Sequence, residues 1–161
     1  MKKIILSAIA VLAFGLTNAQ MKFGVKAGFV AQSYKATVDS GFGTVSVTGS
    51  ESGFFGGVFL DIPIADKMQF HPEVDFAAIT NNNSLVAPLL IKYSFFEGFN
   101  AMAGPGLNYS LDAKSDEFSV SADVGASYDI TQNFGADIRY DIGLTGDSKI
   151  SGLFVGAYYR F

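Results

Sequence analysis

Two carboxylates, Glu73 and Asp75, are the residues of this sequence best spaced to do chemistry. They are two residues apart, so an extended strand places both on one face, where one could act as an acid and the other as a base. His71, the only histidine, precedes Glu73 by the same interval. A catalytic histidine would need a nucleophile placed beside it, and a metal site would need a second histidine. We therefore predict no catalytic, metal-binding or cofactor-binding residues.

Further charged residues share the spacing of Glu73 and Asp75, and they come from segments along the whole chain. We predict that they form one cluster inside the folded protein, comprising Lys26, Glu73, Asp75, Lys92, Asp123, Asp137, Arg139, Asp141 and Arg160. The same alternation assigns Lys22, Asp61 and His71 to this interior. Carboxylates that face arginines can form bidentate, charge-assisted pairs. The cluster is therefore expected to be a packed salt-bridge network, not an acid–base site.

The elements that must position these charges are strands, because apolar and polar residues alternate with period two and no helical period competes. We expect eight strands of about ten residues, the length that a tilted transmembrane strand requires. Their predicted ranges are 21–32, 53–62, 68–78, 85–95, 99–109, 118–128, 134–144 and 152–161. Connections alternate between longer and shorter, which predicts an up-and-down antiparallel barrel with both termini at one end.

Three kinds of interruption separate or mark these strands. Residues 33–52 form the longest connection, rich in Ser, Thr and Gly, and are the predicted contact surface of the protein. Its piece 44–48 could instead continue the hairpin. Short turns are expected at 63–67 and at Glu97-Gly98. Gaps or bulges in the hydrogen-bond ladder are expected at the strand prolines, because proline cannot donate to the ladder: Pro72, Pro88 and Pro105.

The distribution of aromatic residues and glycines predicts which face meets lipid. Aromatic residues begin and end the apolar faces, which places them in two girdles: Phe23, Phe29, Phe70, Phe76, Phe99, Tyr109, Phe118 and Tyr128. Most strand glycines fall on the polar face, where a narrow barrel has little room. Both features favour a transmembrane barrel with a polar interior. The alternative is a soluble, lipocalin-like calyx, in which the apolar face would point inward.

The first residues are predicted to be a cleaved signal peptide. A basic start, an apolar stretch and small residues before the Ala19–Gln20 bond are typical of such a segment. We therefore expect a signal peptide over 1–19 and one barrel domain over 20–161; the alternative is a retained N-terminal anchor. The chain has no cysteine, which excludes disulfides and thiolate metal sites. Its formal net charge of −4 argues against a nucleic-acid partner.

The mature chain resembles the small outer-membrane β-barrel proteins of the Bacteroidetes, often described as PorT-like. The resemblance is carried by the motifs Asn18-Ala19-Gln20, Phe23-Gly24-Val25-Lys26-Ala27-Gly28, Leu85-Val86-Ala87-Pro88-Leu89-Leu90-Ile91-Lys92-Tyr93, Ala103-Gly104-Pro105-Gly106 and Tyr159-Arg160-Phe161. It implies localisation in the bacterial cell outer membrane after export through the periplasm. It also implies that Tyr159 and Phe161 supply the C-terminal signal read by the barrel-assembly machinery.

Together these features predict an all-β, eight-stranded antiparallel transmembrane β-barrel that is not an enzyme. The expected role is structural or a surface interaction, with outer-membrane lipid and the assembly machinery as partners, and the expected state is a monomer. Two alternatives stay open. The barrel could be a narrow, porin-like conduit for small hydrophobic molecules or ions, or a lipid-modifying enzyme that uses His71.

Overall fold

The chain folds into one closed antiparallel β-barrel. The computed structural model describes residues 21–39, 44–80, 83–112, 118–145 and 148–161. Eight strands follow one another around the barrel in chain order: β1 (Lys22–Asp39), β2 (Thr44–Ala65), β3 (Met68–Ile79), β4 (Ser84–Phe96), β5 (Phe99–Ser110), β6 (Phe118–Asp129), β7 (Phe134–Gly143) and β8 (Ser148–Arg160). The predicted all-β class and strand number are therefore confirmed. The predicted signal peptide and its Ala19–Gln20 bond lie outside the described residues.

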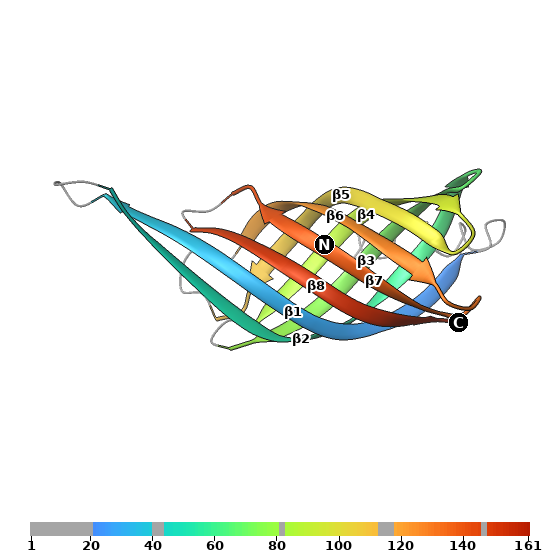
Figure 1. The fold of residues 1–161 in the computed structure, drawn as a ribbon, viewed down its shortest axis with the longest axis horizontal. Coiled ribbons are helices and arrows are strands. Elements are labelled where there is room, and N and C mark those ends of the chain that lie inside the picture. Colours follow the sequence, from blue (N-terminus) through green and yellow to red (C-terminus); the bar gives the residue numbers. More distant parts are fainter. Residues whose placement is uncertain (1–20, 40–43, 81–82, 113–117, 146–147) are drawn as a thin grey trace, which may run out of the picture.

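The barrel closes where the first strand pairs with the last. β1 and β8 are antiparallel from Gly24↔Arg160 to Ala36↔Ser148, and Figure 1 shows them side by side across the front of the barrel. The C-terminal residue extends this seam, because the Phe161 amide donates to the Phe23 carbonyl at 2.8 Å. The rings of Phe23 and Phe161 stack, with centroids 5.7 Å apart. Closure leaves no open sheet edge along the seam, as a strand structure in lipid requires.

The hairpin of β1 and β2 extends past the rest of the barrel, at the end opposite the C-terminus (Figure 1). The two strands pair from Lys22↔Asp61 to Asp39↔Thr44, whereas β2 pairs with β3 only as far as Gly53↔Ile79. Most of 33–52 is therefore strand, and the prediction of a long connection there is wrong. Over 44–48, Thr and Ser alternate with Val. The threonines and valines favour extended backbone, and the segment continues the hairpin, as the alternative prediction had it.

The turns and ladder gaps lie close to the predicted places. β2 runs to Ala65, so the turn before β3 is shorter than predicted, and Lys67 adopts a positive φ of 62° there. Gly98 has a φ of 81°, which glycine adopts without strain in the tight β4–β5 hairpin. The ladder is interrupted between Pro72↔Leu89 and Asp75↔Val86, and again between Pro88↔Gly106 and Ile91↔Ala103. Register is unchanged across both interruptions, so they are gaps without bulges.

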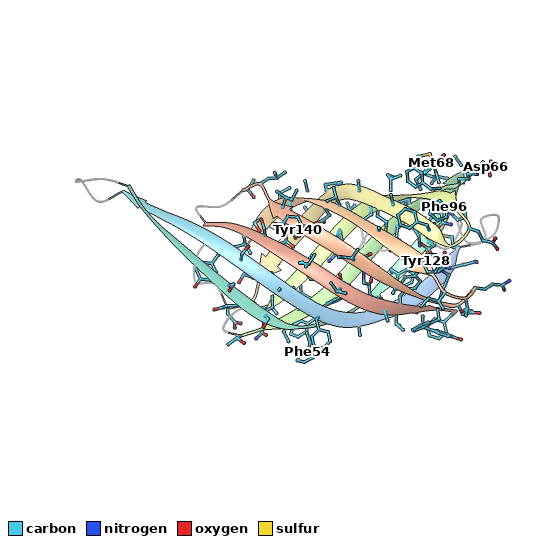
Figure 2. The ribbon with its side chains drawn as sticks, viewed as in Figure 1. Phe54, Asp66, Met68, Phe96, Tyr128 and Tyr140 are labelled. Carbon is cyan, nitrogen blue, oxygen red and sulfur yellow. The ribbon has the colours of Figure 1, made fainter. Side chains whose placement is uncertain are left out.

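The exterior of the barrel is apolar, as the aromatic and glycine patterns predicted. Six of the eight predicted girdle residues are exposed, and Phe70 and Phe99 are half-buried. In Figure 2, Phe54 and Tyr140 project from the outside of the wall, and Phe96 and Tyr128 lie toward the end that carries the C-terminus. In the part of the chain that the structure describes, no helix is long and apolar enough to cross a membrane.

The interior is filled by polar and aromatic side chains that pack over glycines. A Cβ added to Gly24 would lie 2.1 Å from the Phe59 ring, and one added to Gly57 would lie 2.1 Å from an Asp75 carboxylate oxygen. The residues next to these glycines along the chain point outward and are bulky, as Phe23 beside Gly24 and Val58 beside Gly57 show. Small residues inside and large residues outside are what a narrow membrane barrel needs. A soluble calyx would show the reverse, so that alternative is excluded.

Candidate functional site

The centre of the barrel interior is an arginine that bridges two strands. Arg139 of β7 has no exposed surface, and it donates from one terminal nitrogen to Glu73 and from the other to Asp75 of β3, the second at 2.9 Å. Its guanidinium also lies 4.5 Å from the centroid of the Phe154 ring. Glu73 and Asp75 are therefore each held in an ion pair with Arg139, and both are poorly placed to exchange protons with a substrate.

A lysine of the first strand completes this cluster. The Lys26 ammonium donates to Glu73 at 3.0 Å and to Asp137 of β7 at 2.5 Å. Lys26, Glu73 and Asp137 are each less than a tenth exposed. These contacts thus join β1, β3 and β7 across the interior. Each of these charges has an opposite charge in direct contact, because buried ions are tolerated only when they are paired.

A second group of ion pairs surrounds Asp61 of β2. One oxygen of Asp61 lies 2.5 Å from His71 Nδ1 and 3.6 Å from Lys92 Nζ, and the other lies 2.8 Å from Arg160 Nε. His71 Nε2 contacts Glu73 at 2.9 Å, so the histidine connects this group to the Arg139 cluster. Both ring nitrogens of His71 are thereby engaged by carboxylates. The arrangement leaves no free nitrogen for a nucleophile or a metal, and no three His, Cys, Asp or Glu among the described residues are placed to hold a metal ion.

Two carboxylates on β6 and β7 have only neutral hydrogen-bond partners. Asp123 of β6 and Asp141 of β7 are register partners, and both are buried. Asp123 accepts a hydrogen bond from Ser121 at 3.5 Å, and Asp141 accepts one from Asn108 at 3.1 Å. The predicted nine-residue cluster is therefore divided: seven members form the two linked ion-pair groups, and Asp123 and Asp141 stand apart from them. Lys22 was also assigned to the interior, but it is exposed, because it begins β1 at the rim.

Asp129 and Tyr158 also contact the second ion-pair group, and neither was singled out from the sequence. Asp129, the last residue of β6, accepts hydrogen bonds from the Tyr158 hydroxyl at 2.5 Å and from Arg160 at 3.1 Å. The signal was present, because Asp129 continues the inward series of β6 and Tyr158 continues that of β8. The predicted strand 118–128 stops one residue short of Asp129, because this residue directly precedes the polar turn.

Side chains leave little space inside the barrel. The cavity lined by residues such as Lys26, His71, Lys92 and Asp137 has a volume of about 10 Å³. This is close to the minimum that one water molecule needs. Beside it lies an apolar cluster that fills the interior under the extended hairpin: Val30, Phe55, Ala77, Ile79, Val86 and Phe154. The ladder gaps near Pro88 and Pro105 are also backed by buried side chains, since Leu90 has no exposed surface and Met102 is 4% exposed.

The extended hairpin is the other candidate site. Along β2, residues 44–52 pair with β1 but not with β3, so among the described strands this segment has one unpaired edge. An unpaired edge presents backbone amides and carbonyls that can pair with another chain. The hairpin takes the place of the predicted connection 33–52 as the candidate contact surface, and its described part is strand.

Comparison with known proteins places the fold. No family model and no curated protein matches the chain. One similar solved structure is that of Ail, the attachment invasion locus protein of Yersinia pestis, in complex with the heparin analogue sucrose octasulfate. It is 13% identical with a TM-score of 0.54, and it covers 88% of this chain and 99% of its own. A structure of Ail in a phospholipid bilayer nanodisc is 12% identical with a TM-score of 0.53, and it covers 88% of this chain and 100% of its own.

A structure from the de novo design of transmembrane β-barrels is 14% identical with a TM-score of 0.54, and covers 85% of this chain and 95% of its own. At these identities the comparison establishes the fold alone. An apolar exterior, a charged interior and this fold together are those of an outer-membrane-type transmembrane β-barrel.

Proposed function

We propose that the protein is an integral barrel of the bacterial outer membrane with a closed interior and a structural or surface-interaction role, and that it is not an enzyme. The observation that carries this proposal is the ion-pair network around Arg139, which joins β3 and β7 across the interior. A conduit would need space along the axis, and the cavity in the network has room for about one water molecule.

Planar-bilayer recording of the purified protein tests the closed interior. We expect no stable conductance from the native protein, since the buried ions hold each other in place. Variants that shorten the central side chain, Arg139→Ser together with Glu73→Ser, should give openings if they fold. Steady conductance from the native protein at neutral pH would contradict the proposal.

The surface-interaction role is assigned to the β1–β2 hairpin, because it extends beyond the other strands (Figure 1). The test replaces residues 37–46 by a two-residue turn, which keeps every β1–β8 pair up to Ala36. Adhesion of cells that display the native or the shortened protein is then compared. Heat-modifiable gel migration controls for folding, and equal adhesion by two folded proteins would refute the assignment. The Ail complex suggests heparin as one probe, but the net charge of −4 leads us to expect no binding of a polyanion.

A second candidate function is a lateral path for small hydrophobic molecules. The ladder gaps next to Pro88 and Pro105 favour it, because backbone pairing there is already lost. The buried Leu90 and Met102 stand behind the gaps and close them. Uptake of a hydrophobic dye by liposomes that contain the protein should therefore be unchanged, and a clear increase would favour this second function over the first.

We also propose that the chain belongs to the PorT-like barrel proteins of the Bacteroidetes, on the motifs quoted above, and that it is a monomer in the outer membrane. Tyr159 and Phe161 are proposed as the signal for the barrel-assembly machinery. The stacking of Phe161 on Phe23 at the seam supports a role in closing the barrel. Photocrosslinking from position 159 to the assembly machinery during export would test the partner directly.

A further inference from the structure

A hollow of about 300 Å³ lies on the exterior of the barrel, across β8, β1 and β2. It is lined by Phe29 and Ala31 of β1, Ser52 and Phe54 of β2, and Leu153 and Val155 of β8, so β1 is the middle strand of the hollow. Phe54 projects from the outside of the wall in Figure 2. The volume is at the lower end of that of small-molecule pockets, about 300–1,000 Å³.

The hollow has a simple cause in the strand register. Phe29 pairs with Phe54 on β2 and with Val155 on β8, which makes one bulky row across the three strands. Two residues farther along, Ala31 pairs with Ser52 and with Leu153, so on β1 and β2 small side chains follow the bulky row. The Phe29 and Phe54 rings are in contact, with centroids 4.8 Å apart, and they form a fixed aromatic wall.

Polar residues continue the floor of the hollow toward the extended hairpin. The next row on the exterior is Ser33, which pairs with Ser50 on β2 and with Ser151 on β8. Ser33 and Ser50 are exposed and Ser151 is half-buried. The exterior surface therefore changes within a few residues from apolar side chains to hydroxyl-bearing ones.

We propose that this hollow is a binding site for one phospholipid of the outer membrane, with an acyl chain between the aromatic wall and Leu153 and the headgroup at the serine row. The hollow is part of the lipid-facing belt, and the change from apolar rows to a row of serines matches the change from acyl chain to ester and headgroup in such a lipid. The inference rests on the proposed function only for the placement of the barrel in a membrane.

Native mass spectrometry of the full mature protein tests the site, with dioleoyl phosphatidylglycerol added to protein in a mild detergent. We expect one lipid to stay bound to the native protein. Ala31→Phe fills the floor of the hollow, and displacing about two methylenes of the chain is enough for about a tenfold loss of affinity. The matched control is Ala103→Phe, because Ala103 is an exposed exterior alanine on β5 between Ile91 and Val124.

The outcomes separate the lipid from other occupants and from a failure of the fold. A lipid lost from Ala31→Phe and kept by Ala103→Phe supports the site. No lipid on the native protein, or equal loss from both variants, overturns it. A dimer of the native protein that Ala31→Phe abolishes would show that a second copy covers the hollow, which also overturns it. Heat-modifiable migration of all three proteins reports the barrel itself, so a folded barrel without bound lipid refutes the site and not the proposed function.

Discussion

Ile138 and Arg139 are neighbours on β7, yet they lie on opposite sides of the barrel wall and in opposite environments. Ile138 is 46% exposed, whereas Arg139 has no exposed surface. In a water-soluble protein this exposure pattern would be unfavourable for both residues. Here the exposed side faces hydrocarbon and the buried side is a network of ions. The comparison teaches that the exposed fraction of a side chain in this fold measures its contact with lipid. An apolar residue is therefore favoured at the exposed Ile138, and a charged one at its buried neighbour Arg139.

The largest effect is expected on the interior side of this comparison. Arg139→Met removes the partner of two buried carboxylates, Glu73 and Asp75, and should lower the free energy of unfolding by about 3–5 kcal/mol. Urea unfolding from lipid vesicles, followed by far-UV circular dichroism, measures it. Adding Glu73→Gln and Asp75→Asn should restore part of the loss, because no unpaired charge then remains. A single variant as stable as the native protein would show that the ion pairs are dispensable.

On the exterior side, Ile138→Arg places a charge against the hydrocarbon. The expected cost is about 2–4 kcal/mol near the middle of the membrane. The control is Ile130→Arg, since Ile130 is equally an exposed isoleucine but lies in the turn after β6. It should cost about 1 kcal/mol or less. The same vesicle titration serves both, and equal costs at the two positions would mean that the belt does not face lipid.

A smaller effect is expected at the seam, where exterior aromatic residues meet. Phe161→Ala removes the stacking on Phe23 and should cost about 1 kcal/mol. Its yield of folded barrel in the outer membrane should fall more than its stability, if Phe161 also serves in assembly. Phe118→Ala, an exposed aromatic residue at the other end of the barrel, is the control for loss of a girdle ring. Equal yields from the two variants would leave Phe161 with an anchoring role only.

The smallest effect on stability is expected within the interior, where a carboxylate with neutral partners can be compared with one in an ion pair. Asp123→Asn removes one of two facing carboxylates that have neutral partners, and the amide can still accept from Ser121. We expect stability to change by less than about 1 kcal/mol, with the sign toward stabilisation, because like-charge repulsion is relieved. Asp75→Asn is the matched change in the ion-pair network and should destabilise, since it weakens the contact with Arg139. Unfolding midpoints that move in the same direction would contradict this distinction.

Some features of this protein follow from its sequence alone. Alternation of period two assigns each residue to one side of a strand without knowledge of its neighbours, so the eight strands, the two faces and the inward set of charges could be predicted. The terminal Phe161 could likewise be placed beside Phe23, because a barrel with no open edge must pair its first and last strands.

Only the tertiary structure decided which inward charges meet. Arg139 contacts Glu73 and Asp75 at sequence separations of 66 and 64, while the carboxylates of Asp123 and Asp141 are left to neutral partners. The length of the β1–β2 hairpin and the exterior hollow also depend on the register between strands. Alternation fixes the side of the wall on which each residue lies, but not its height, which is its position along the barrel axis relative to residues of another strand. Register, tilt and closure set those heights, and they belong to the whole barrel.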